Sequence, residues 1–257
     1  MPRAEIDACT LLCESCGYVV EGLDPASACP ECGKPIAESL PERRIGTPYQ
    51  QRPTLRNLAK TWWMTVRHPI RTLDVMAIHR RSASKLGRST LVIGMLFAGM
   101  AGPLAPAAIL TNDVIRITSP SASSLASKVA INSVALFVMP AVLYGVVVAV
   151  LGTIEATGLT LFMRRFRRQS RGEIARSICA HGAVGWLVCG VCFGLLMTWN
   201  LLNSFTDLEE TVWALAGLGI ALVGVLAGFL FFEVFAYLGL RRLKYANRPR
   251  PPSGDST

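Results

Sequence analysis

Apolar residues gather into long blocks in the second part of this chain. Each of four blocks has at least the ~20 residues that a helix needs to cross a bilayer. The blocks cover residues 89–110, 129–163, 177–202 and 212–240. This pattern predicts a mainly α-helical protein whose residues 89–240 form a polytopic membrane bundle of four spans.

The second block, residues 129–163, is the longest and contains Pro140. As a helix it would reach ~52 Å, which is too long for one upright span and too short for two. We expect one tilted or protruding helix, but the sequence leaves open whether the block forms one helix or two.

A helical periodicity also precedes the spans, in residues 54–88. Thr54 is the predicted N-cap, and Pro69 is expected to break or kink the segment. Trp62 and Trp63 suit the headgroup level, so we predict interfacial amphipathic helices; the alternative is packing on the protein's own cytoplasmic side. The apolar positions are Leu55, Leu58, Trp62, Val66, Ile70, Leu73 and Ala77.

Composition supports the membrane class. The 257 residues are 51% hydrophobic, with a mean hydropathy of +0.41, and only 17% are charged, against about 25% in a typical soluble domain. Residues 1–40 carry two basic and seven acidic side chains, whereas most of the other basic residues flank the apolar blocks. Charge placed in this way favours a membrane surface over nucleic acid as the partner.

The loops orient the spans, because basic residues mark the cytoplasmic side. Six arginines lie between the second and third blocks, whereas the loop of residues 203–211 has no basic residue. We therefore expect both termini in the cytoplasm, in a cytoplasmic membrane of bacterial type. Residues 241–257 are predicted to be a basic, disordered tail, and residues 41–53 a linker rich in proline and charge.

Two CxxC pairs lie in the head, residues 1–40, with the spacing Cys13-x2-Cys16-x12-Cys29-x2-Cys32. Four thiolates at this spacing suit one structural Zn²⁺ ion, and a domain of ~30 residues needs the metal to fold. A redox pair is the alternative for a single CxxC, but the presence of two pairs favours metal. With four ligands the site is closed, so we expect a structural and not a catalytic ion.

The head resembles a zinc ribbon with CPxCG-type knuckles, over residues 9–36. The order of parts in residues 57–240 resembles the Yip family of small, multi-spanning Rab/Ypt-interacting proteins and their bacterial relatives. The segments HPIRTL and RRFRRQSRGEIARSICAHGAVGW carry that likeness. Yip proteins usually have five spans, and four are predicted here. The resemblance implies a role in membrane trafficking or membrane shaping, and it supplies no catalytic residue.

Three ionisable residues, Glu155, His181 and Glu233, lie in the cytoplasmic halves of three different spans. They could face one another as an intramembrane polar cluster, which is the basis for a transporter or channel using Glu155 and Glu233. The alternative is that Glu155 lies near the water boundary and has a structural partner. The motif CGVC, residues 189–192, and Gly224-x3-Gly228 are interpreted as helix packing.

We therefore expect a non-enzymatic membrane protein that displays a cytoplasmic zinc-ribbon adaptor for a protein partner, with a scaffold or membrane-organising role. The acidic loop EGLDPASA has no basic–aromatic surface, so no nucleic-acid partner is expected. The chain contains no nucleophile elbow, phosphate loop or HExxH motif. A membrane enzyme is therefore the least favoured class, and a small transporter or channel is the main alternative.

Overall fold

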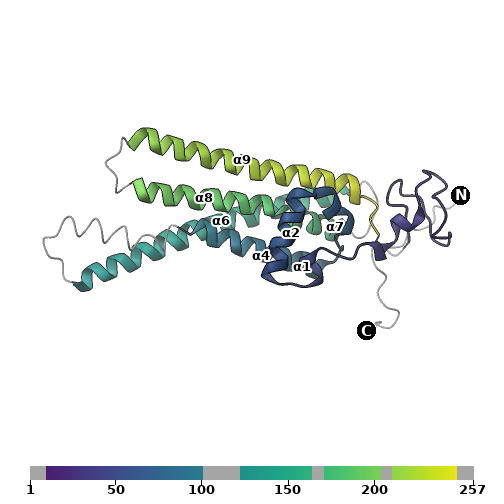
Figure 1. Cartoon of the computed structure of the whole chain (residues 1–257), viewed down its shortest axis with the longest axis horizontal. Coiled ribbons are helices and arrows are strands. Elements are labelled where there is room, and N and C mark those ends of the chain that lie inside the picture. The colour runs from purple at the N-terminus through teal and green to yellow at the C-terminus, as the bar shows by residue number, and fades with distance from the viewer. Residues whose placement is uncertain (1–9, 101–121, 164–170, 204–209, 248–257) are drawn as a thin grey trace. The chain divides into compact units, whose positions relative to one another are not determined.

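The computed structural model describes residues 10–100, 122–163, 171–203 and 210–247, and these are mainly α-helical (Figure 1). Two 3₁₀ helices come first, η1 (Ile36–Ser39) and η2 (Pro41–Arg43). The α-helices are α1 (Pro48–Gln51), α2 (Leu55–Arg67), α3 (Pro69–Val75), α4 (Arg80–Ala98), α6 (Ala122–Met163), α7 (Arg171–Gly182), α8 (Val184–Asn203) and α9 (Glu210–Leu243). Within these ranges the only β-structure is two isolated bridges, both in the head.

Three helical segments of the described residues are long and apolar enough to cross a membrane. They are Phe137–Met163 in α6, Arg171–Trp199 across α7 and α8, and Gly217–Leu243 in α9. These segments overlap the last three predicted blocks. The first predicted span, residues 89–110, lies partly outside the described residues, so the fourth span stays a prediction.

Helix α6 answers the question that residues 129–163 left open, because it is one helix of 42 residues with Pro140 inside it. At 1.5 Å per residue it is about 63 Å long, roughly twice the thickness of a bilayer's hydrocarbon core. Its apolar segment is the C-terminal part, from Phe137 to Met163. Helix α6 is therefore longer than one crossing requires, and the excess is its N-terminal part, residues 122–136.

The helix boundaries after the head follow the predicted local signals. The Thr54 hydroxyl accepts a hydrogen bond from the Asn57 backbone N–H at 3.3 Å, as an N-cap does. Helix α2 ends at Arg67, and Pro69 is the first residue of α3. Both predictions are confirmed, since a proline without an N–H can open a helix but not continue one.

The buried face of α2 differs from the predicted apolar stripe. Leu58 is buried, but its buried neighbours are Thr61 and Thr65, and the Thr61 hydroxyl accepts a hydrogen bond from the Tyr49 N–H at 3.0 Å. Trp63, by contrast, is 66% exposed. Helix α2 thus packs on the protein through threonines and leaves apolar side chains outside, where a bilayer surface would suit them.

The chain divides into two compact units. The first comprises Met1–Gly87, Thr153–Gly182 and Val234–Thr257, and the second comprises Arg88–Gly152 and Ala183–Glu233. In the second unit α8 lies beside α9, where a Cβ on Gly185 would meet the Gly228 backbone oxygen (Figure 1). The Cys189 thiol donates a hydrogen bond to the Val225 carbonyl at 3.4 Å. The glycines and Cys189 therefore serve helix packing, as the sequence predicted.

Candidate metal centre

Two nearly identical turns build the centre. In the first, the Gly17 N–H donates to the Cys13 carbonyl at 2.8 Å; in the second, the Gly33 N–H donates to the Cys29 carbonyl at 2.9 Å. Both glycines have positive φ angles, +81° and +72°, which a residue with a Cβ adopts only under strain. A short β-bridge flanks each turn, Leu12–Val19 and Ala28–Pro35. The two CxxC motifs therefore form equivalent knuckles.

The knuckles bring four thiols together. The Cys13 and Cys32 sulfurs are 3.6 Å apart, the Cys16 and Cys29 sulfurs are 3.7 Å apart, and all four lie within 4.8 Å of one another. These distances are far longer than a disulfide bond of ~2.05 Å. The four residues predicted from spacing alone are thus placed so that they could hold a metal ion.

The two thiols of the first knuckle have pKa values shifted in opposite directions. Burial of Cys13 alone would raise its pKa, but hydrogen bonds from the backbone of Cys16 and Ser15 and from neighbouring thiols lower that pKa to about 7. Burial and the neighbouring thiols raise the pKa of Cys16 to about 12. The Cys13 thiolate therefore forms more readily than the Cys16 thiolate, and a cation bound between them would favour the thiolate form of both.

Among residues 10–40 the head has little core apart from its sulfurs. The buried cluster consists of Cys13, Val20, Cys29 and Ile36, with Leu11 packed against it. Two of these four side chains are themselves candidate ligands. So small a core cannot hold ~30 residues in one conformation, and metal binding would have to supply the remaining folding free energy.

Asn247, four residues after the end of α9, joins the head to the helices of the same unit. Its side-chain amide donates to the Leu12 carbonyl at 2.7 Å and to the Ser39 carbonyl at 2.6 Å, and it accepts from the Leu12 N–H at 3.1 Å. Asn247 is only 3% exposed. The predicted tail begins at residue 241, but the ordered chain continues through this buried residue; residues 248–257 lie outside the described part.

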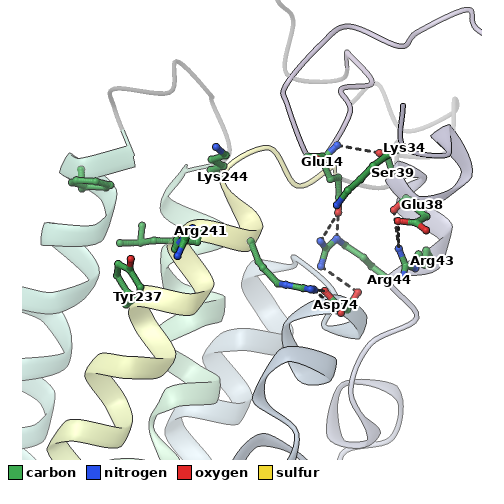
Figure 2. A pocket seen from close by; sticks show the side chains of 14 residues that line it. Glu14, Lys34, Glu38, Ser39, Arg43, Arg44, Asp74, Tyr237, Arg241 and Lys244 are labelled. Carbon is green, nitrogen blue, oxygen red and sulfur yellow. Dashed lines mark hydrogen bonds and ion pairs between the residues drawn. The ribbon is translucent and has the colours of Figure 1, made fainter. Parts of the chain in front are cut away.

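Glu14, inside the first knuckle, extends the same network (Figure 2). Its carboxylate accepts the Asn247 N–H at 2.9 Å and two hydrogen bonds from the Arg44 guanidinium, at 2.7 and 3.2 Å. Arg44 also donates to the Leu73 carbonyl in α3 at 2.8 Å. The side chains of Arg44 and Glu14 are 5% and 17% exposed, so this bidentate ion pair is largely shielded from water.

Comparing substitutions at Gly17 and Gly33 separates the contact between the head and Tyr245 from the strain within a knuckle. A Cβ on Gly17 would lie 2.7 Å from the Tyr245 ring, whereas a Cβ on Gly33 would meet nothing within 4 Å. Both Gly→Ala changes strain the backbone by about 1–2 kcal/mol, but only Gly17→Ala also clashes with Tyr245. We expect Gly17→Ala to speed proteolysis of residues 41–47 more than Gly33→Ala does.

Adding Tyr245→Ala to Gly17→Ala should remove the clash and bring the cleavage rate towards that of Gly33→Ala carrying the same Tyr245→Ala change. Equal cleavage of the two glycine variants would show that the Tyr245 contact does not hold the head.

The residues of the predicted polar cluster lie in both units. Glu155 and His181 belong to the first unit and Glu233 to the second, and both glutamates are half-buried. His181 is 1% exposed, and its Nδ1 donates to the Ser177 carbonyl at 2.8 Å while its Nε2 lies 3.3 Å from the Thr47 hydroxyl. Both ring nitrogens thus have partners outside the predicted set, and the cluster stays a prediction.

We expect Glu155→Gln and Glu233→Gln to leave insertion and thermal unfolding nearly unchanged, because Gln keeps the size and hydrogen-bonding capacity of Glu. Glu155→Leu should destabilise by ~1–3 kcal/mol through unpaired polar groups. Unfolding in detergent and proton flux in reconstituted vesicles would measure these effects. A flux that the wild type supports and both Gln variants abolish would instead favour the transporter.

Sequence reasoning missed the residues that attach the head. Asn247 follows a basic run and precedes a proline-rich end, so it carries no local signal of burial. Glu14 and Arg44 are ordinary charged residues in the sequence, 30 positions apart. Only Gly17 had a signal in the sequence, and that signal indicated the turn and not the contact with Tyr245.

The chain matches no protein-family model, no curated protein and no solved structure.

Proposed function

We propose that the four cysteines bind one structural Zn²⁺ ion in a zinc ribbon. Four sulfurs at ~2.3 Å from a zinc ion form a tetrahedron with edges of about 3.8 Å. The Cys13–Cys32 and Cys16–Cys29 distances of 3.6 and 3.7 Å fit such edges. Two of the thiols, Cys13 and Cys29, are buried, which suits an ion that is enclosed and does no chemistry.

We further propose that the protein is a non-enzymatic membrane adaptor, Yip-like in its order of parts, that displays this zinc ribbon at the cytoplasmic surface of a bilayer. The observation that carries the proposal is the attachment of the head through Asn247 and the Glu14–Arg44 pair. A head held by both of these contacts is presented in one orientation, as an adaptor requires, and does not swing on a flexible linker.

The exposed apolar side chains of the head are the proposed contact for a cytoplasmic protein. Tyr18 is 40% exposed, Val19 42% and Leu23 39%, and all three lie between the two knuckles. Exposed apolar side chains of this kind are available for contact with a protein partner. The contacts of Asn247 and Glu14 that attach the head do not involve the side chains of Tyr18, Val19 and Leu23. These three side chains therefore stay accessible.

Crosslinking in membranes tests the adaptor role. The full chain would be compared with Tyr18→Ser/Leu23→Ser and with Ile45→Ser, a control at an exposed apolar residue outside the head. We expect a protein crosslinked to the wild type and to the control to be lost from the head variant, whose zinc content stays unchanged. Identical crosslinking patterns for all three proteins would rule out this surface.

The adaptor also requires the head and the C-terminus to be cytoplasmic. We expect tags at both ends, and cysteine labelling of the two ends, to report the cytoplasmic side. Glutamine at the six arginines of residues 164–176 should weaken that orientation, because these charges dominate the bias. Ends that report opposite sides would contradict four spans and favour the five-span topology of the Yip family.

A further inference from the structure

A cavity of about 560 Å³ lies in the first unit, between the head and the C-terminal ends of α6 and α9. Its volume is within the range of small-ligand sites, ~300–1,000 Å³. Three acidic side chains and six basic ones line it, which gives the wall a net charge of +3. The basic residues are Lys34, Arg43, Arg44, Arg241, Arg242 and Lys244.

The acidic side chains are already paired (Figure 2). Glu14 binds Arg44 at 2.7 Å, Asp74 binds Arg242 at 2.7 Å, and Glu38 lies 4.0 Å from Arg43. Each carboxylate thus neutralises one of the six cations. The remaining positive charge belongs to residues outside these pairs.

Three cations remain: Lys34 from the second knuckle, and Arg241 and Lys244 from the end of α9 and just beyond it. No carboxylate of the described residues lies within 4.0 Å of their nitrogens. Arg241 lies 5.8 Å from the Tyr237 ring and Lys244 lies 4.9 Å from the Tyr245 ring, and these contacts position the cations without neutralising them. Their N–H groups are therefore available to an anion.

Part of the lining is apolar and belongs to membrane-capable helices. Phe162 is the penultimate residue of the apolar segment in α6, and Tyr237 and Leu240 lie in the last two turns of the segment in α9. Phe162 is 56% and Tyr237 58% exposed. Acyl chains would cover such side chains in a bilayer, and the cations next to them would then lie at the depth of the headgroups.

We propose that this cavity binds a phosphate group through Lys34, Arg241 and Lys244. The apolar part of the lining favours the headgroup of an anionic phospholipid as its source, and a soluble phosphate is the other source. A ligand here would contact the second knuckle and the C-terminal end of α9 together. The cavity would therefore link lipid composition to the attachment of the head.

Native mass spectrometry of the full chain in detergent, titrated with phosphatidylglycerol or phosphatidylcholine, tests the proposal. Each basic residue near a membrane surface contributes about fivefold to anionic-lipid binding, so Arg241→Gln/Lys244→Gln should weaken phosphatidylglycerol binding roughly thirtyfold. The control, Lys60→Gln/Arg67→Gln, removes two exposed cations from α2, outside the cavity. Because these two cations lie outside the cavity, this variant should lose much less affinity than the cavity variant, and neither charge variant should alter the weaker binding of phosphatidylcholine.

Lys34→Gln, at an exposed side chain of the head, should weaken binding by about fivefold. This single variant tests the proposal even if the double variant misfolds. The zinc content and the elution volume of the double variant would reveal such misfolding. The proposal is wrong if the α2 control loses as much affinity as the cavity variants, or if no cavity variant loses affinity.

Inorganic phosphate and Phe162→Ser distinguish the two sources. If the ligand is a lipid, Phe162→Ser weakens phosphatidylglycerol binding, and millimolar phosphate does not displace the lipid. If the ligand is a soluble phosphate, inorganic phosphate displaces phosphatidylglycerol from the wild type, and Phe162→Ser has no effect. Either result supports a phosphate site, provided that the cavity variants described above weaken phosphatidylglycerol binding.

Discussion

Cys29→Ser is expected to reduce bound zinc from one ion per chain to nearly none. Cys29 is 2% exposed, is one of four converging thiols and forms part of the head's small core. Structural zinc contributes about 10–16 kcal/mol in small zinc domains, so a head that loses a ligand loses most of its folding free energy. Metal analysis of the purified full chain, with proteolysis of residues 10–40, measures both effects.

The helices should remain inserted in the Cys29→Ser variant, because their three apolar segments lie outside the head and are each long enough to cross a membrane. Cys179→Ser is the matched control: it changes a half-buried cysteine outside the head and should keep one zinc ion. A chelator should reproduce the effect of Cys29→Ser on the wild type. A wild-type chain purified under reducing conditions with almost no metal would contradict the zinc ribbon.

Asn247→Leu is expected to weaken the attachment of the head while leaving its zinc bound. Leucine keeps the approximate size of the side chain but removes the partners of the Leu12 N–H, the Leu12 carbonyl and the Ser39 carbonyl. Each buried polar group left unpaired costs about 1–3 kcal/mol, so the total is about 3 kcal/mol or more. Hydrogen exchange of the Leu12 amide should accelerate about a hundredfold or more.

Asn57→Leu is the control for this experiment. The Asn57 amide donates to the Arg52 carbonyl at 2.9 Å in an exposed position, where water can replace the lost bond. That variant should leave the Leu12 amide protected. If Asn247→Leu releases zinc as readily as Cys29→Ser does, the head is not an autonomous metal domain, and attachment and metal binding form one cooperative unit.

Several features could be predicted because their causes are local. The CxxC spacing sets which sulfurs share a turn, and Gly17 and Gly33 allow the positive φ that the turn requires. Thr54 begins α2 and Pro69 begins α3 through bonds and clashes within a few residues. The apolar blocks predicted membrane-capable helices because length and hydropathy are also local properties of the sequence. A run of ~20 apolar residues is long enough for a helix to cross the hydrocarbon core of a bilayer.

The sequence by itself thus determined the four cysteines that could hold a metal ion, the helix boundaries near Thr54 and Pro69, and the membrane-capable segments. Only the tertiary structure decided that Thr61 and Thr65 face inward on α2, and that Asn247 pairs with Leu12 across 235 positions. Short-range patterns report how a residue restricts its own turn or helix, but they carry no information about which distant backbone groups will need a partner once water is excluded.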